Sequence, residues 1–292
     1  AGEAGEGEKG AVLQPMWSPS GHFVVCTRIL KVGASKEGRP TTECIIADPL
    51  NEAPVRTFDK ILPFFYMFSP CGRRLTFLGA KDNGSIALNV VDVIYSKERA
   101  IRQPKEVIYG GPVFYSFKPN DARSNLIAIH LGGRGHDQKG WVGIVDIETG
   151  LPILSLAGGA LLDGDKTKPD AMPGIFRAPH WAPHLGLNGS PGILWFRKSP
   201  PLPSLDGAPS PAPADADDSS TLLISTHDLA TGEVHTCSLC QIRGMGSAVA
   251  SPNGQHIAML VSKPAAEPTS ELSVLSAEAR GPGERPTFWE GG

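Results

Sequence analysis

A short turn motif centred on proline recurs along this chain of 292 residues. Four copies begin with a large aromatic residue and the fifth begins with alanine: Trp17–Ser20, Phe68–Cys71, Phe117–Asn120, Trp181–His184 and Ala250–Asn253. Each copy precedes a short apolar segment typical of a β-strand, such as His22–Thr27 or His256–Val261. Proline fixes φ at the first turn position, and a following Gly or Asn tolerates left-handed backbone. The motif therefore predicts a series of strand–turn–strand units.

The spacing of the motif predicts the architecture. Its prolines are Pro19, Pro70, Pro119, Pro183 and Pro252, so successive copies are 51, 49, 64 and 69 residues apart. Repeats of this length that contain only strands and turns are typical of a β-propeller made of four-stranded antiparallel blades. No stretch of ten or more residues shows convincing helical periodicity. We therefore expect an all-β chain with blades at 11–62, 63–111, 112–159, 175–243 and 244–292.

Two segments carry a resemblance to a known family. Pro63–Leu78 and Gly111–Pro119 combine the turn motif with an apolar strand in a pattern that resembles TolB-like propellers, a WD40-like repeat architecture. The resemblance is closer to the stand-alone TolB-like proteins of bacteria and plants. The same repeat builds the propeller of prolyl-oligopeptidase and dipeptidyl-peptidase proteins, and the resemblance extends over residues 12 to 290. It implies a fold and says almost nothing about function, since such propellers serve unrelated activities. The aromatic and proline residues of the motif are therefore assigned structural roles: Trp17, Pro19, Phe68, Pro70, Phe117, Pro119, Trp181, Pro183 and Pro252.

The number of blades leaves two ways to close the ring. Propellers of the TolB type usually have six or seven blades, and five are visible here. Either residues absent from this chain complete the ring, which is the interpretation we favour, or five units close it with divergent end strands. An open ring would expose sheet edges, which can pair with a partner.

Three segments depart from the repeat. Residues 1–10 are rich in Gly and Glu and are predicted to be disordered. Residues 199–220, rich in Pro, Ala, Ser and Asp, are predicted to be a disordered insertion, for which a tolerated loop expansion is the simplest explanation. A second insertion covers residues 160–176, and either loop is a place where a propeller could carry binding residues.

Charge, hydropathy and cysteine content restrict the classes of function. A net charge of −3 indicates neither a nucleic-acid-binding surface nor a basic membrane patch. No apolar run approaches the length of a membrane span. Five cysteines, an odd number spread over different blades, favour a reducing compartment over a disulfide framework. The absent initiator Met and the plant-like resemblance favour the plastid stroma (chloroplast), with the cytoplasm as the alternative.

Three groups of residues could in principle bind a metal, and each has a simpler explanation. Cys237 and Cys240 have the spacing of a redox or zinc motif, but they lie in an expected strand with no second pair. His180 and His184 flank a Pro-containing turn, so they are interpreted as turn residues. A Gly-rich loop after His130 could hold an anion or metal with Arg134, His136 and Asp137, although a solvated hairpin is favoured. We therefore predict no metal, no cofactor and no catalytic residue.

Catalysis by the propeller alone is not supported by the sequence. The peptidases that share the repeat depend on an α/β-hydrolase domain with a Gly-x-Ser-x-Gly motif, which is absent here. Metal-centred propeller enzymes need several acidic or His residues on the inner strands, where this chain offers mainly apolar and hydroxyl side chains. The alternatives are an enzyme that uses the central channel and the propeller of a hydrolase whose catalytic domain is absent.

We therefore predict a non-catalytic scaffold that binds proteins, as a subunit or assembly factor of a larger complex. Five aromatic residues are candidates for the contact: Phe64, Phe65, Tyr66, Phe114 and Tyr115. The alternative for these side chains is that they pack between blades.

Overall fold

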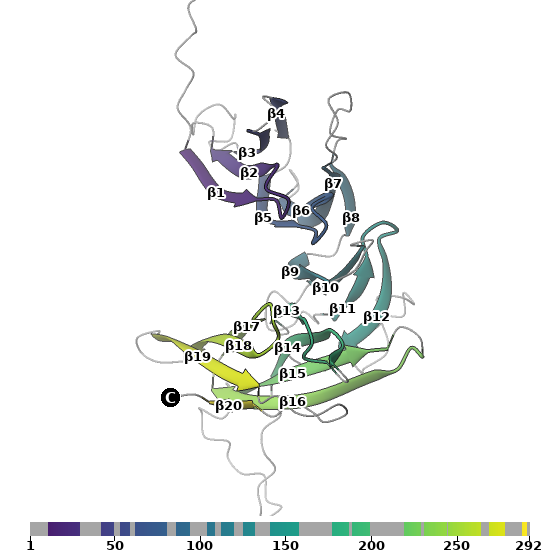
Figure 1. Ribbon diagram of the computed structural model, residues 1–292, viewed down its shortest axis with the longest axis vertical. Helices are drawn as coiled ribbons and strands as arrows, with labels where there is room; N and C mark the ends of the chain where they lie inside the picture. Colours follow the sequence, from purple (N-terminus) through teal and green to yellow (C-terminus); the bar gives the residue numbers. More distant parts are fainter. Residues whose placement is uncertain are drawn as a thin grey trace, which may run out of the picture. The chain divides into compact units, whose positions relative to one another are not determined.

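The computed structural model describes residues 11–29, 42–49, 53–58, 62–80, 86–93, 104–108, 112–119, 125–131, 141–157, 177–186, 189–198, 219–228, 231–243, 245–263, 269–277 and 288–290. In these residues twenty strands form five four-stranded antiparallel sheets (Figure 1). Each sheet contains four consecutive strands in chain order, as a propeller blade does. The prediction of an all-β chain built from four-stranded blades is confirmed.

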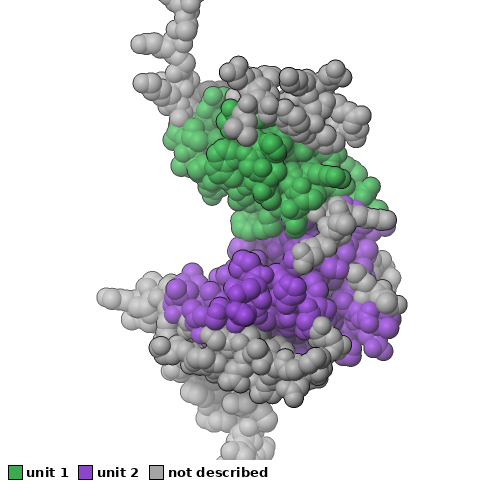
Figure 2. Space-filling model, viewed as in Figure 1, with its two compact units in different colours: residues 1–112, 120–124, 147–150 green, residues 113–119, 125–146, 151–292 purple. Residues whose placement is uncertain are grey.

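The chain divides into two compact units (Figure 2). Unit 1 consists of residues 1–112, 120–124 and 147–150, and unit 2 consists of residues 113–119, 125–146 and 151–292. Blade 1 contains β1 (Ala11–Trp17), β2 (Val24–Ile29), β3 (Thr42–Asp48) and β4 (Ala53–Phe58). Blade 2 contains β5 (Leu62–Phe68), β6 (Arg74–Ala80), β7 (Ile86–Asp92) and β8 (Lys105–Ile108).

The remaining three blades supply most of unit 2. Blade 3 contains β9 (Pro112–Phe117), β10 (Leu126–Leu131), β11 (Trp141–Asp146) and β12 (Leu151–Ala157). Blade 4 contains β13 (Arg177–Ala182), β14 (Gly192–Lys198), β15 (Ser219–His227) and β16 (Val234–Arg243). Blade 5 contains β17 (Met245–Ala250), β18 (His256–Lys263), β19 (Thr269–Ala277) and β20 (Phe288–Glu290).

The serine before proline explains why the turn motif folds as it does. In blade 2 the Ser69 amide donates to the Arg74 carbonyl at 2.8 Å, and the Ser69 hydroxyl accepts from the Arg74 amide at 3.0 Å. The Gly72 amide donates back to the Ser69 carbonyl at 2.8 Å, with Gly72 at φ +70°. Blades 1 and 5 repeat these bonds around Ser18 and Ser251. The Ser-Pro-x-Gly sequence therefore closes the hairpin with its own backbone and one hydroxyl.

A β-bulge interrupts the first strand of several blades, three residues before the end of the strand. In β1 the register shifts between Leu13 and Met16, and in β5 it shifts between Phe64 and Met67. The first bulged residue has left-handed backbone in both strands, with Gln14 at φ 53° and Phe65 at φ 54°. Neither residue is glycine, so each bulge holds a conformation that side chains disfavour.

This geometry gives a prediction for Gln14, whose side chain is exposed. Replacing Gln14 with Gly removes the cost of left-handed backbone, about 1–2 kcal/mol, and adds some chain entropy in the unfolded state. We expect Gln14→Gly to raise the free energy of unfolding by about 0.5–1 kcal/mol in urea titrations. The matched control is Gln241→Gly, because Gln241 is also exposed and lies on the strand β16. This variant should lower the free energy of unfolding by about 0.5–1 kcal/mol. Equal losses in both variants would show that the bulge at Gln14 is unstrained.

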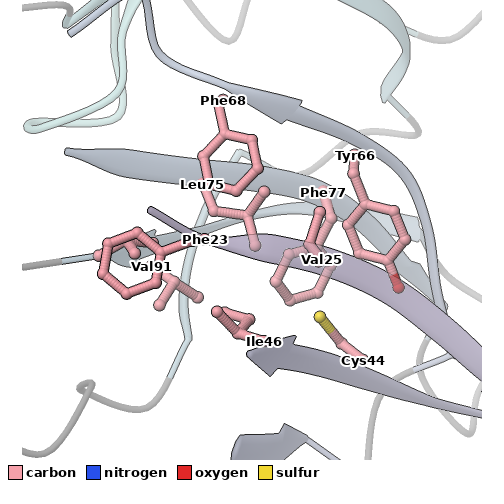
Figure 3. Close-up of a cluster of buried hydrophobic side chains, with 10 residues drawn as sticks. Phe23, Val25, Cys44, Ile46, Tyr66, Phe68, Leu75, Phe77 and Val91 are labelled. Carbon is pink, nitrogen blue, oxygen red and sulfur yellow. The ribbon is translucent and has the colours of Figure 1, made fainter. Parts of the chain in front are cut away.

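The core of unit 1 lies between blade 1 and blade 2 (Figure 3). Ten buried residues form this cluster: Phe23, Val25, Cys44, Ile46, Tyr66, Phe68, Leu75, Phe77, Val91 and Val93. The Tyr66 hydroxyl lies 2.8 Å from the Thr27 hydroxyl, so the two blades are also joined by a buried hydrogen bond. Burial raises the pKa of the Cys44 thiol to about 12, which keeps this thiol neutral and inert.

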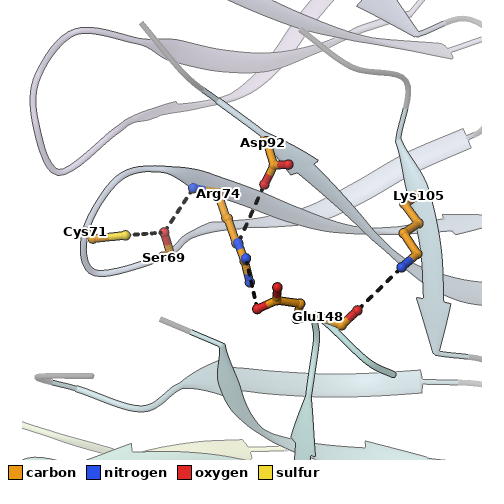
Figure 4. Close-up of polar contacts among 6 residues, drawn as sticks. All are labelled: Ser69, Cys71, Arg74, Asp92, Lys105 and Glu148. Carbon is orange, nitrogen blue, oxygen red and sulfur yellow. Dashed lines mark hydrogen bonds and ion pairs between the residues drawn. The ribbon is translucent and has the colours of Figure 1, made fainter. Parts of the chain in front are cut away.

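A polar network in unit 1 surrounds the turn between β11 and β12 (Figure 4). Arg74 on β6 lies 3.6 Å from the Asp92 carboxylate and 3.7 Å from the Glu148 carboxylate. The Lys105 ammonium donates to the Glu148 carbonyl at 3.4 Å. These contacts are partly exposed, so each is expected to contribute at most about 1 kcal/mol.

Among the described residues of unit 2, one buried cluster lies on each side of blade 4. Blade 3 and blade 4 share the first: Ala128, Val142, Ile144, Trp181, Ile193, Trp195 and Leu223. Blade 4 and blade 5 share the second: Ala182, Leu185, Leu194, Phe196, Leu222, Ile224, Ala248, Ile257, Met259 and Val261. Blade 4 therefore uses alternating strand positions to cover blade 3 with one face and blade 5 with the other.

Several predicted features lie outside the described residues. These are the segment 1–10, the insertion 160–176, the loop that contains Arg134, His136 and Asp137, and residues 199–218 of the second insertion. The last two residues of that insertion, Ser219 and Ser220, begin β15. The disorder expected for these segments stays a prediction.

Candidate protein-contact surface

The five aromatic residues proposed as contacts lie on the first strands of blades 2 and 3. Phe64 and Phe65 on β5 are half-buried, and Phe114 on β9 is exposed. Tyr66 and Tyr115 are buried, and burial raises the pKa of the Tyr66 hydroxyl. These two tyrosines therefore pack in the core, which is the alternative that the sequence left open. Contact through the other three stays a prediction.

Trp17 is the exception among the aromatic residues of the turn motif. Phe68 and Phe117 are each 7% exposed and Trp181 is 5% exposed, whereas Trp17 is 58% exposed. Trp17 lies opposite Val24 on the neighbouring strand, just as Phe68 lies opposite Leu75. The same position in the repeat is therefore buried in three blades and open in blade 1. The sequence predicted a structural role for Trp17 and missed its exposure, because buried and exposed copies alike carry an aromatic residue two positions before proline.

The pairing of the strands shows which face of blade 1 is open. Phe68 and Leu75 belong to the face of blade 2 that packs on blade 1. The corresponding face of blade 1 contains Trp17 and Val24, and we call it the leading face. Cross-strand pairing adds these residues to it: Val12, Cys26, Arg28, Glu43, Ile45 and Ala47. Most of these described side chains are apolar, and Arg28 and Glu43 form an ion pair among them. Val12 and Trp17 are exposed, whereas Glu43 and Ile45 are buried.

Leu13 and Met16 of β1 pair with Thr27 and Val25, so they lie on the other face of blade 1. Every residue of β1 is exposed, and Val12, Leu13 and Met16 are among the large apolar side chains that remain accessible. The carboxylate of Glu43 is buried and its partner Arg28 is partly exposed. Burial raises the pKa of the nearby Cys26 thiol, against the opposing effect of the Arg28 charge. A protein partner that covered the leading face would therefore meet a pre-formed ion pair and mostly hydrocarbon.

Blade 5 carries a second apolar surface, in unit 2. Leu260 on β18 lies opposite Leu272 on β19, and Ala258 lies opposite Val274. Leu260, Leu272 and Val274 are exposed. Met259 and Val261, which alternate with them on β18, are buried against blade 4. Blade 5 therefore buries one face and leaves the other, which we call the trailing face, open.

His180, His184 and His227 all belong to blade 4. Burial lowers the pKa of His180 on β13, and burial also lowers the pKa of His227 on β15. His184 occupies the turn after β13, where its Nδ1 lies 3.4 Å from the Gly189 carbonyl and its φ is 63°. Within the described ranges, no three His, Cys, Asp or Glu side chains gather as metal ligands. In the same part of the chain, no helix has the length and apolar character needed to cross a bilayer.

The comparisons with known proteins concern the fold. No family model matches the chain, and no curated protein matches it. The acylaminoacyl peptidase of Pyrococcus horikoshii aligns with 91% of this chain at a TM-score of 0.53 and 11% identity, and the match spans 38% of the peptidase. The β-propeller domain of the Trilobed protease from Pyrococcus furiosus aligns with 96% of this chain at a TM-score of 0.52 and 13% identity, over 71% of that domain.

A structure described as TolB from Agrobacterium tumefaciens aligns with 91% of this chain at a TM-score of 0.50 and 12% identity, and the match spans 77% of TolB. Identities of 11–13% indicate the fold alone. This chain spans about two fifths of the acylaminoacyl peptidase, so the whole enzyme's activity does not transfer with the fold. The chain has the β-propeller fold found in TolB and in the propellers of acylaminoacyl and Trilobed peptidases.

Proposed function

We propose that this chain is a non-catalytic β-propeller scaffold that binds another protein through the leading face of blade 1. The observation that carries the proposal is the exposure of Trp17 at a position that is buried in blades 2, 3 and 4. A large exposed aromatic side chain surrounded by apolar groups is typical of a protein-binding site. The partner would present an apolar surface, as blade 1 presents to blade 2.

The trailing face of blade 5 supports the same function. Leu260, Leu272 and Val274 form a second exposed apolar surface, and monomeric proteins rarely leave such surfaces uncovered. A chain with apolar surfaces on two blades suits a subunit or assembly factor of a larger complex.

The test combines substitution with co-purification. In mild salt, we expect a stoichiometric partner to co-purify with the wild-type chain and to be lost from Trp17→Ala. Hot-spot tryptophans contribute about 2 kcal/mol or more to binding, so the purified partner should bind the variant at least roughly 30-fold more weakly. Trp17 is exposed, so its replacement should leave the free energy of unfolding within about 0.5 kcal/mol of wild type.

The matched control is Leu151→Ala on β12, because Leu151 is also a large exposed apolar residue. This variant should retain the partner with wild-type affinity. The proposal fails if Trp17→Ala keeps the partner, or if both variants lose it equally. A chain that has no stoichiometric companion under these conditions would also contradict a scaffold role.

A further inference from the structure

A β-bulge places two cysteines of β16 on the same face of blade 4. Cys237 lies opposite Ile224 and Cys240 lies opposite Leu222, with one extra residue, Leu239, inserted between these pairs. Residues three apart on a regular strand point to opposite faces. Here both thiols lie on the face of Leu222 and Ile224, because the extra residue in the bulge turns Cys240 to the side of the sheet that Cys237 occupies. The spacing of this motif in the sequence does not reveal this arrangement.

A third sulfur lies at the same place. Met259 on β18 belongs to the buried cluster between blades 4 and 5, and Cys237 and Cys240 pack against that cluster. The Cys240 Sγ lies 3.8 Å from the Met259 Sδ. Both cysteines are partly buried, whereas Met259 is 2% exposed. A thiol and a thioether therefore meet between the sheets of blades 4 and 5, and the Cys237 thiol lies on the same face of blade 4 as Cys240.

The donor set indicates a soft metal. Soft sulfur ligands bind Cu(I), zinc and iron–sulfur clusters, but zinc sites use thiolate, imidazole and carboxylate ligands, so the thioether favours Cu(I). Two sulfurs that bind one ion through bonds of about 2.3 Å at a tetrahedral angle lie about 3.8 Å apart. The separation of Cys240 and Met259 already has this value. We infer that Cys237, Cys240 and Met259 form a binding site for a single Cu(I) ion.

Cys44 and Cys71 lie in different surroundings. Cys44 is buried in the core of unit 1, and Cys71 is exposed in a turn with its Sγ 3.4 Å from the Ser69 hydroxyl. Binding at Cys237 and Cys240 releases the thiol protons to solvent and involves no change in oxidation state. The ion would connect β16 of blade 4 to β18 of blade 5, so it should stabilise unit 2 as well as bind to it.

The experiment is an anaerobic titration of the reduced chain with Cu(I), in competition with the chromogenic chelator bicinchoninate. We expect one tightly bound equivalent and three sulfur neighbours in the copper X-ray absorption spectrum. Cys237→Ala together with Cys240→Ala should abolish this equivalent. Met259→Leu conserves the volume of the side chain, so it should keep the fold while weakening Cu(I) binding by at least about tenfold. Bound Cu(I) should also raise the melting temperature of the wild type and not of the double variant.

Cys71→Ala is the matched control, since it removes a thiol elsewhere and should leave the tight equivalent unchanged. The inference is overturned if the double variant binds Cu(I) as tightly as the wild type. It is also overturned if Met259→Leu binds Cu(I) with unchanged affinity, or if the site prefers Zn(II) to Cu(I). None of these results depends on the proposed scaffold function, because no step uses Trp17 or a protein partner.

Discussion

Replacement of Phe77 by alanine is expected to lower the free energy of unfolding by about 3–5 kcal/mol. Phe77 lies on β6 and is completely buried in the cluster between blades 1 and 2 (Figure 3). Its ring centroid lies 6.0 Å from that of Tyr66, with the two rings tilted by 51°. The substitution would remove the apolar area of the ring, its aromatic contact and the packing around it, and a rigid core refills such a cavity only in part.

Urea titrations followed by circular dichroism would measure this loss. The matched control is Phe114→Ala on β9, where the side chain is exposed and the expected loss is below about 1 kcal/mol. Hydrogen exchange should show faster opening of β2, β3 and β6 in the Phe77 variant, because these strands surround the cavity. Similar losses in the two phenylalanine variants would mean that the core between blades 1 and 2 is not the main source of stability for unit 1.

Gly143→Ala is expected to destabilise unit 2 by about 3 kcal/mol, at the upper end of the usual cost of overpacking. Gly143 lies in the middle of β11, where most strands carry a side chain. A Cβ atom added there would overlap the Leu154 carbonyl and the indole ring of Trp141. The indole is held in place because its Nε1 donates to the Ser155 hydroxyl at 3.0 Å. The carbonyl belongs to the backbone, so the clash cannot be relieved by a side-chain rotation.

The control for Gly143 is Gly232→Ala. Gly232 has a φ of +75° and open space around its Cα, so its replacement costs only the left-handed backbone, about 1 kcal/mol. Urea midpoints of the two variants should differ clearly, with the Gly143 variant the less stable. Equal midpoints would show that β11 and β12 can separate to admit a methyl group, which would contradict a tightly packed blade 3.

The turn motif made the fold predictable, because it is a local structure. Ser69, Pro70 and Gly72 each have a separate task in one hairpin: the hydroxyl accepts an amide, the ring fixes φ and the glycine adopts left-handed backbone. The bonds involved join residues at most five positions apart, so the hairpin can be predicted from the local sequence alone. The same reasoning predicted four-stranded blades from the motif spacing, and the structure confirms them. The expectation of a six- or seven-bladed ring stays a prediction.

The candidate contacts were less predictable, because burial depends on the neighbouring sheet. Tyr66 and Phe65 are adjacent aromatic residues, yet Tyr66 bonds to Thr27 in the core while Phe65 has left-handed backbone in a bulge. A bulge changes which residues share a face, and no local signal distinguishes it from regular strand. The same limit applies to Cys237 and Cys240, which the sequence placed on a plain outer strand.

The sequence alone determined the hairpins, their repeat and the division into blades, because proline, glycine and the serine hydroxyl act through bonds within a few residues. Only the tertiary structure decided which copies of the motif are covered. Trp17 and Trp181 both begin a Trp-x-Pro segment, but Trp181 packs between blades 3 and 4, whereas Trp17 is exposed. The physical reason is that burial of an aromatic ring requires a second apolar surface, and that surface belongs to a distant part of a chain or to a partner.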